Sequence, residues 1–234
     1  ISMLIRSIIF YVLIVLWTIF MGILFLPYLI LDNIHIRKPI NFWIIGIFKI
    51  LKVSCNITYE IKGRENIPDN PIIIAPKHQS AFETFVIFLH FNNSIFIHKK
   101  ELLYIPIFGQ YLKKTKMISI NRNESIASMR SILDKTKNKI KNGYSIIIFP
   151  EGTRKKPGEK TSYKNGIYGI YKNTNTDVLP IAVNSGKYWP KHTFKKYPGK
   201  ITISILKKIP TNLNKLEFLN RLQSEIENEV EKIS

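Results

Sequence analysis

The sequence predicts an α/β protein with a central, largely parallel sheet flanked by helices, preceded by a membrane-embedded helix or helical hairpin. Three observations carry this prediction. From residue 56 onward, short runs of β-branched residues alternate with helical stretches, as strand–helix–strand units do. Several of these runs are continuously apolar, which is typical of strands buried on both faces. A long uncharged segment opens the chain.

The opening segment, residues 7–31, runs for 25 residues without a charged side chain. A helix needs about 20 residues to cross a bilayer, so we expect a retained membrane helix here. Pro27 should kink this helix or end it early. A second apolar stretch, residues 41–53, should lie in the membrane interface or return the chain to the same side. The alternative for the opening segment is a buried core helix.

The expected elements of the body follow from the same patterns. Strands are predicted over residues 56–63, 71–77, 94–99, 116–122, 145–150, 177–184 and 201–208. Helices are predicted over residues 80–91, 124–141, 162–172 and 212–233. In the last helix the residues expected to face the core, because they recur at helical spacing, are Leu213, Leu216, Leu219, Leu222, Ile226 and Val230. Thr211 is the expected N-cap of that helix.

Charge and cysteine content narrow the range of partners. The chain carries 35 basic and 16 acidic residues, and its first 216 residues carry 33 against 11. This charge suits an acidic membrane surface, a phosphorylated small molecule or a nucleic acid. A membrane partner also explains the apolar opening segment, so we expect no nucleic acid partner. The single cysteine, Cys55, excludes a disulfide framework and fits a reducing compartment.

Two polar stretches follow predicted strands: PKHQSAFETF at residues 76–85 and FPEGTR at residues 149–154. Sites in parallel α/β sheets collect where strands end and helices begin, so we expect the two stretches to share a cleft. His78 and Glu83 would point about 140° apart on one regular helix. They can meet only if His78 lies in the turn before the helix and Glu83 in its first turn. Ser80 is the expected N-cap, at capping-box spacing from Glu83.

A paired His78 and Glu83 would form a general base. Glu83 would fix the imidazole tautomer, so that the other ring nitrogen could take a proton from a hydroxyl; which nitrogen does which stays open. No GxSxG elbow surrounds Ser80, so a base acting on the substrate's own hydroxyl is favoured over a serine hydrolase. The alternative is that Glu83 only caps the helix. The other histidines show no metal-ligand spacing, and we predict no metal.

These stretches resemble four sequence blocks of the glycerolipid acyltransferases. The first block is His78 with an acid five residues on, the second is KMISINR (116–122), the third FPEGTR (149–154) and the fourth DVLPIAVNSG (177–186). They occur in the family's order and are most similar to bacterial members that act on 1-acyl-sn-glycerol 3-phosphate. The resemblance covers about residues 55–210. One departure is Glu83, where the family usually has aspartate.

The apolar opening predicts membrane-anchoring helices over residues 1–53, and the resemblance implies an acyltransferase catalytic domain over residues 54–234. The domain would move a fatty acyl group from acyl-CoA or acyl-acyl-carrier protein to the 2-hydroxyl of lysophosphatidic acid (1-acyl-sn-glycerol 3-phosphate), making phosphatidic acid. No cofactor beyond this acyl-donor substrate is expected. The implied roles are general base for His78, its orientation for Glu83, phosphate binding for Arg122, Arg154 and Lys100, and acceptor binding for Glu151, Gly152 and Thr153.

Two other functions remain open at this point. One is an acyltransferase for another lysophospholipid, and the other is a non-catalytic, membrane-anchored binder of anionic lipid. For the enzyme we expect the bacterial inner membrane, with the catalytic domain on the cytoplasmic face that holds the donor; proteolysis of the domain only from outside would contradict this.

Backbone N–H groups of residues 79–81 are the expected oxyanion donors.

Overall fold

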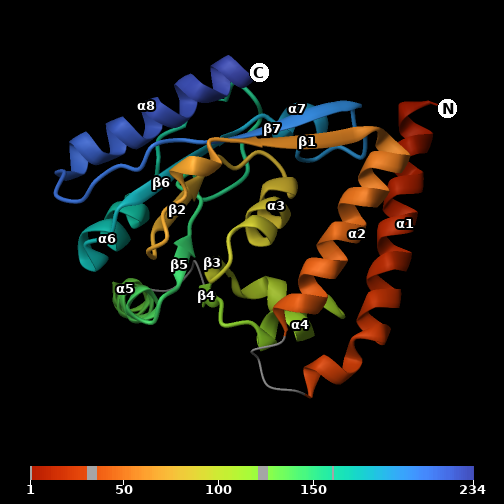
Figure 1. The fold of residues 1–234 in the computed structure, drawn as a ribbon, viewed down its shortest axis with the longest axis horizontal. Coiled ribbons are helices and arrows are strands. Elements are labelled where there is room, and N and C mark those ends of the chain that lie inside the picture. The colour runs from red at the N-terminus through yellow and green to blue at the C-terminus, as the bar shows by residue number, and fades with distance from the viewer. Residues whose placement is uncertain (1, 31–35, 121–125, 160) are drawn as a thin grey trace.

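The computed structural model describes residues 2–30, 36–120, 126–159 and 161–234, and for residues 126–128 the backbone alone (Figure 1). The helices are α1 (Met3–Leu24), α2 (Arg37–Cys55), α3 (Phe82–His90), α4 (Phe108–Lys114), α5 (Ile126–Lys141), α6 (Asn165–Thr174), α7 (Ser185–Tyr188) and α8 (Lys215–Ile233). The 3-10 helices are η1 (Leu26–Leu29), η3 (Arg64–Asn66) and η4 (Lys100–Tyr104). The strands are β1 (Ile57–Lys62), β2 (Ile73–Pro76), β3 (Ser94–Lys99), β4 (Ile118–Ile120), β5 (Ser145–Ile147), β6 (Val178–Val183) and β7 (Gly199–Ile205).

The strands form one seven-stranded sheet in the order β1-β7-β6-β2-β5-β3-β4. Neighbouring strands run parallel except for β6 and β7, which pair antiparallel. The predicted fold class, a largely parallel sheet flanked by helices, is therefore confirmed. Because β6, β2 and β5 are parallel neighbours, their carboxyl ends meet at one edge of the sheet.

Helices cover both faces of the sheet, as the continuously apolar strands require. Alternate residues of β2 point to opposite faces. Ile74 packs in one core cluster with residues of α2 and α3, whereas Ile73 and Ala75 pack in a second cluster with residues of α6 and α8. In Figure 1 the blue helix α8 accordingly lies apart from the red and orange helices α1 and α2.

The N-terminal segment is a helical hairpin in which α1 and α2 run side by side (Figure 1). The Trp17 indole N–H donates to the Trp43 carbonyl at 2.9 Å, and the Trp43 indole N–H donates to the Thr18 hydroxyl at 3.0 Å. Gly46 permits the close approach, since a Cβ there would lie 2.2 Å from the Trp17 ring. The helix α1 ends at Leu24, and Pro27 lies in the short helix η1, as expected for a proline that ends a helix early.

Within the described part of the chain, α1 is the one helix long and apolar enough to cross a membrane. Only 22% of its most apolar stretch is buried, which is the opposite of what a core helix shows. Ser7, Phe10, Met21 and Gly22 are its buried residues, and the Phe10 ring packs edge-on against Trp189 of the body. The hairpin thus shares the core of the body, and the division after residue 53 stays a prediction; α2 itself runs on to Cys55.

The C-terminal helix α8 corrects two expectations. Its N-cap is Asn214, which forms a capping box with Glu217, so the prediction of Thr211 was wrong. Leu216 is 71% exposed, so its predicted place in the core was also wrong. With the helix beginning at Lys215, the buried residues follow an i, i+4 stripe of Phe218, Leu222, Ile226 and Val230. The short helices α4 and α7 were not predicted.

We expect Phe218→Ala to lower the free energy of unfolding by about 3–5 kcal/mol, because truncating a buried aromatic ring leaves a cavity. The Phe218 ring is fully buried and stacks on Tyr171 with a centroid distance of 4.1 Å. Leu216→Ala, on the exposed side of the same helix, is the matched control and should cost less than about 0.5 kcal/mol. Chemical unfolding in detergent measures both, and equal losses would contradict the observed register of α8.

Candidate active site

Three adjacent strands end beside one another and supply the site. His78 follows β2, the FPEGTR segment follows β5, and Ser185 follows β6. The two stretches singled out in the sequence therefore lie in one cleft at the carboxyl edge of the sheet, where α/β proteins place their sites.

The side chains of His78 and Glu83 meet as the turn geometry requires. His78 Nδ1 lies 3.0 Å from Glu83 Oε1, and Glu83 is fully buried in the first turn of α3. Glu83 Oε1 also accepts the N–H groups of Gln79 and Ser80, while Oε2 accepts the Ser185 hydroxyl at 2.7 Å. Four donors thus fix this carboxylate. The catalytic roles of His78 and Glu83 stay predictions.

The start of α3 differs from the expected capping box. Of the two hydrogen bonds of a capping box, the one to the Glu83 side chain forms, since its carboxylate accepts the Ser80 N–H at 2.6 Å. The Ser80 hydroxyl instead accepts the N–H of Phe82, and Ala81 is the residue before the first helical turn. The expected oxyanion donors are also corrected in part. The N–H groups of Gln79 and Ser80 point at Glu83, so neither is available to a substrate oxygen.

The FPEGTR segment holds His78 by its ring and by its backbone. The imidazole stacks on the Phe149 ring at a centroid distance of 3.8 Å. The His78 N–H donates to Glu151 Oε2 at 2.8 Å, and the His78 carbonyl accepts the Lys155 N–H at 2.8 Å. Both backbone hydrogen-bonding groups of the candidate base are thus satisfied by the strand-end segment that follows β5.

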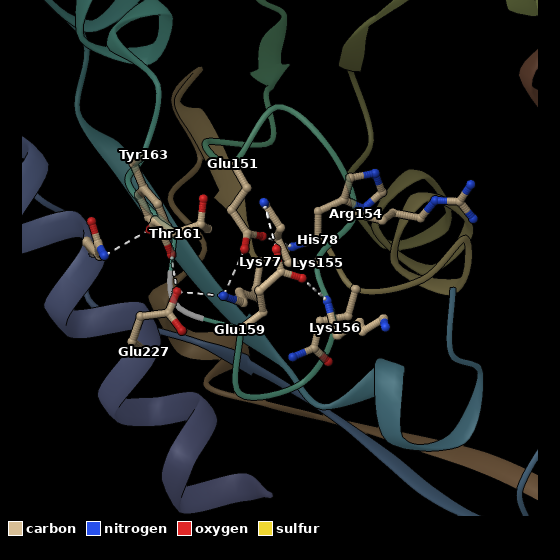
Figure 2. A network of polar contacts seen from close by, with 12 residues as sticks. Lys77, His78, Glu151, Arg154, Lys155, Lys156, Glu159, Thr161, Tyr163 and Glu227 are labelled. Atoms are coloured by element: carbon tan, nitrogen blue, oxygen red, sulfur yellow. Dashed lines mark hydrogen bonds and ion pairs between the residues drawn. The ribbon is translucent and has the colours of Figure 1, made fainter. Parts of the chain in front are cut away.

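Glu151 is fully buried behind His78. Its Oε1 lies 2.8 Å from the ammonium of Lys77, a residue that is itself only 2% exposed. Burial raises the pKa of Glu151, and the Lys77 ammonium opposes that rise. Its contacts in the structure are to Lys77 and to the His78 N–H, as Figure 2 shows. The predicted part of Glu151 in acceptor binding stays a prediction.

The remaining predicted site residues divide between the cavity and its surroundings. Gly152, Thr153 and Arg154 line the cavity, and Gly152 has a φ of +69°, a backbone conformation that favours glycine. Lys100 is exposed at the start of η4 and is not among the described residues that line the cavity, whereas its neighbour Lys99 is. Arg122 lies outside the described residues. The roles of all these residues stay predictions.

A cavity of about 1050 Å³ runs from His78 into the N-terminal hairpin. Its lining is mostly apolar and includes side chains of α1, α2, α3 and α4, among them Met21, Trp43, Phe85 and Phe108. Its polar lining includes His78, Arg154 and the further cations Lys99, Lys164 and Lys191. The Lys191 ammonium also donates to the Arg154 carbonyl at 3.0 Å. A cavity that is apolar at one end and cationic at the other suits an amphiphile with an acidic headgroup.

The sequence pattern missed two residues that the geometry joins to the site. Ser185 lies within the fourth block, but no motif spacing assigned it to Glu83. Lys77 adjoins His78, yet a buried lysine at this point has no sequence signal of its own.

In the described parts of the chain, no group of three His, Cys, Asp or Glu side chains could hold a metal ion. That no metal takes part stays a prediction, made from the spacing of the histidines in the sequence.

The largely parallel sheet, the paired histidine and glutamate at its carboxyl edge and the mostly apolar cavity beside them agree with one family of known proteins. Residues 58–184 match the family described as Acyltransferase, and the chain belongs to that family.

Known relatives and a solved structure agree with this assignment. The chain is 39% identical over 156 residues to a 1-acyl-sn-glycerol-3-phosphate acyltransferase of Pseudomonas aeruginosa, covering 67% of this chain and 61% of that protein. It is 30% identical over 162 residues to the protein of that name from Helicobacter pylori, covering 67% of each chain. The crystal structure of the 1-acyl-sn-glycerophosphate (LPA) acyltransferase PlsC from Thermotoga maritima superposes with a TM-score of 0.79 at 25% identity, over 98% of this chain and 95% of that one. The match spans about three fifths of the Pseudomonas relative and 47% of a Chlamydomonas reinhardtii relative.

We expect Ser185→Ala to lower turnover about tenfold, because Glu83 loses a charge-assisted hydrogen bond worth about 1.5–3 kcal/mol. Ser204→Ala is the matched control: Ser204 is also a buried serine that donates to a glutamate, Glu229, at 2.7 Å, but away from the site. Steady-state turnover and thermal unfolding of both variants check this. Equal turnover in the two variants would contradict a part for Ser185 in holding Glu83.

Proposed function

We propose that the protein is a membrane-bound acyltransferase that moves a fatty acyl group to the 2-hydroxyl of 1-acyl-sn-glycerol 3-phosphate, making phosphatidic acid for phospholipid synthesis. The observation that carries the proposal is the His78–Glu83 pair at the polar end of a long apolar cavity with Arg154 beside it. The printed names of the relatives and of the solved structure support the same acceptor.

In the proposed mechanism His78 acts on the acceptor itself. An ionised Glu83 only accepts hydrogen bonds, so Nδ1 of His78 carries a proton and Nε2 presents its lone pair. Nε2 takes the proton of the 2-hydroxyl as its oxygen attacks the thioester carbonyl carbon. The tetrahedral intermediate collapses, the carbon–sulfur bond breaks, and the thiolate takes the proton from the imidazolium. No acyl-enzyme forms, since the base acts on the acceptor hydroxyl.

The cationic end of the cavity is proposed to bind the phosphate of the acceptor. Arginine presents a planar fork that matches phosphate oxygens, whereas lysine acts as a point charge. Arg154, Lys164 and Lys191 all line this end. The donor is proposed to be acyl-CoA or acyl-acyl-carrier protein, since both present a thioester on phosphopantetheine and either acidic carrier suits a chain of net charge +19.

The membrane is the proposed partner of α1. Many of its apolar side chains are exposed in the described part of the structure, and they include Ile5, Ile8, Val12, Val15, Leu16, Ile19, Phe20 and Ile23. Burying such side chains in lipid is favourable by about 25 cal/mol per Å² of apolar surface. We propose the bacterial inner membrane, with the catalytic domain on the cytoplasmic face where acyl donors are made. The cavity reaches the hairpin, so an acyl chain could enter the site from the bilayer.

The purified protein in detergent is expected to convert lysophosphatidic acid to phosphatidic acid with oleoyl-CoA, palmitoyl-CoA or an acyl-carrier-protein thioester. His78→Ala should lower turnover at least 100-fold, within the about 10²–10⁴-fold range of general base catalysis. Glycerol 3-phosphate and lysophosphatidylcholine serve as comparison acceptors, with product measured by mass spectrometry. Transfer to another lysophospholipid would change the acceptor but keep the chemistry. A folded protein that consumes no thioester would leave a lipid-binding protein as the better account.

Arg154→Lys is expected to raise the KM for lysophosphatidic acid about tenfold and to leave the KM for the acyl donor unchanged. The physical reason is that a lysine ammonium cannot make the forked pair of hydrogen bonds that a guanidinium makes with phosphate. Lys156→Arg, on an exposed position of the same segment, is the control and should change neither constant. A rise in the donor KM alone would instead assign Arg154 to the phosphates of the donor.

A further inference from the structure

Behind the site, the ammonium of Lys77 lies between two carboxylates. It is 2.8 Å from Glu151 Oε1 and 2.6 Å from Glu227 Oε1. Lys77 is 2% exposed and Glu151 is fully buried, while Glu227 on α8 is one-third exposed. The three charges come from the end of β2, the segment after β5 and the C-terminal helix, so the cluster joins three parts of the fold (Figure 2).

Lys77 and His78 are neighbours in the chain, but their side chains point to opposite faces of the sheet. The ladder continues past β2, since the Lys77 N–H donates to the Ile181 carbonyl at 2.8 Å. Alternation then sends Lys77 to the face of Ile73 and Ala75, which α6 and α8 cover, and His78 to the face of α3. The observed contacts agree: Lys77 reaches Glu227 on α8, and His78 reaches Glu83 on α3.

Glu151 links the two faces. Its Oε1 contacts Lys77 and its Oε2 accepts the backbone N–H of His78 at 2.8 Å. The cluster is closed on its far side by Tyr163, whose hydroxyl donates to Glu227 Oε1 at 3.0 Å. The titratable groups facing Glu151 are thus Lys77 and His78 beyond β2, Glu227 on α8 and Tyr163 from the segment before α6.

Burying the charged side chain of Lys77 is less favourable than burying an apolar side chain at the same position. A buried charge is costly to desolvate and costly to leave without its partner, so a buried ion pair is weak evidence of a gain in stability. What this one does is oppose the effect of burial, which raises the pKa of Glu151, and hold that carboxyl in one orientation. A charged acceptor makes the stronger hydrogen bond to the His78 N–H.

We propose that Lys77 and Glu227 are positioning residues for catalysis, which act through Glu151 to hold the backbone of His78 and so set the base against its substrate. The proposal rests on the proposed acyl transfer to a hydroxyl. It makes α8, which lies on the far face of the sheet from the cavity, part of the device that aims the base. Neither residue is among the described residues that line the cavity.

The test compares Glu227→Gln with Glu225→Gln in the full-length protein in detergent. Glu225 lies on the same helix and pairs with Arg221 at 2.7 Å, away from the cluster. Glutamine keeps the size of Glu227 and its oxygen for Tyr163 but removes the charge that faces Lys77. We expect Glu227→Gln to lower kcat about tenfold with both KM values unchanged, and Glu225→Gln to leave kcat unchanged.

Lys77→Met supplies a second readout that a purely structural role would not move. Without the ammonium, Glu151 keeps its proton to higher pH, so the acid limb of the kcat–pH profile should move to higher pH. Activity should then recover in part as pH rises, while the profile of Glu225→Gln stays on that of the wild type. If Lys77→Met does not fold, Glu227→Gln still decides the matter through its kcat and KM.

Unchanged kcat in Glu227→Gln, whatever its melting temperature, would overturn the proposal. A rise in the acceptor KM at constant kcat would also overturn it, because that result would assign the cluster to substrate binding. Both results leave the proposed function standing, since the wild-type protein is active in the same assay. Lack of acyl transfer by the wild-type protein is the separate result that refutes the function itself.

Discussion

The structure depends on the parallel alignment of β6, β2 and β5 at the centre of the sheet. Parallel neighbours must end at the same edge, so Ser185, His78 and Glu151 reach one cleft although they are distant in the chain. The loops after these strands then fasten to one another. The segment after β5 satisfies both backbone groups of His78, and the residue after β6 completes the shell of donors around Glu83. The backbone of His78, the proposed base, is therefore held by hydrogen bonds from the segment after β5.

The two faces of the sheet have different physical tasks. On one face, α1, α2, α3 and α4 line much of an apolar cavity that leads to His78 and that α5 and α6 also border, and the outer surface of α1 is apolar as well. On the other face, α6 and α8 pack a dense aromatic and aliphatic layer around Phe218. In the proposed reaction, close packing on the second face would help to hold the base in position, and the cavity on the first face would admit the acyl chain.

Much of this arrangement follows from local sequence patterns, and the rest depends on contacts between distant residues. The β-branched runs predict every strand of the sheet, and the turn before α3 predicts that His78 and Glu83 meet. The start of α8 was misplaced because Thr211 and Asn214 are both good caps, and only Asn214 has Glu217 three residues on. Lys77 and Glu227 are separated by 150 positions, and no local pattern pairs them. The cavity lining draws on helices from the whole first half of the chain, and α4 is too short to show a helical period.

The pairing of β1 with β7 has a consequence for biosynthesis. The strand β1 directly follows the hairpin, but it pairs with β7, which is the last strand in the chain. During translation the hairpin and β1 leave the ribosome before residues 199–205, so β1 cannot pair until the last strand has been made. Pairing between strands that are far apart in the chain makes folding slow and leaves aggregation-prone intermediates exposed. A bilayer that receives the hairpin early would act as the scaffold on which the sheet is later completed.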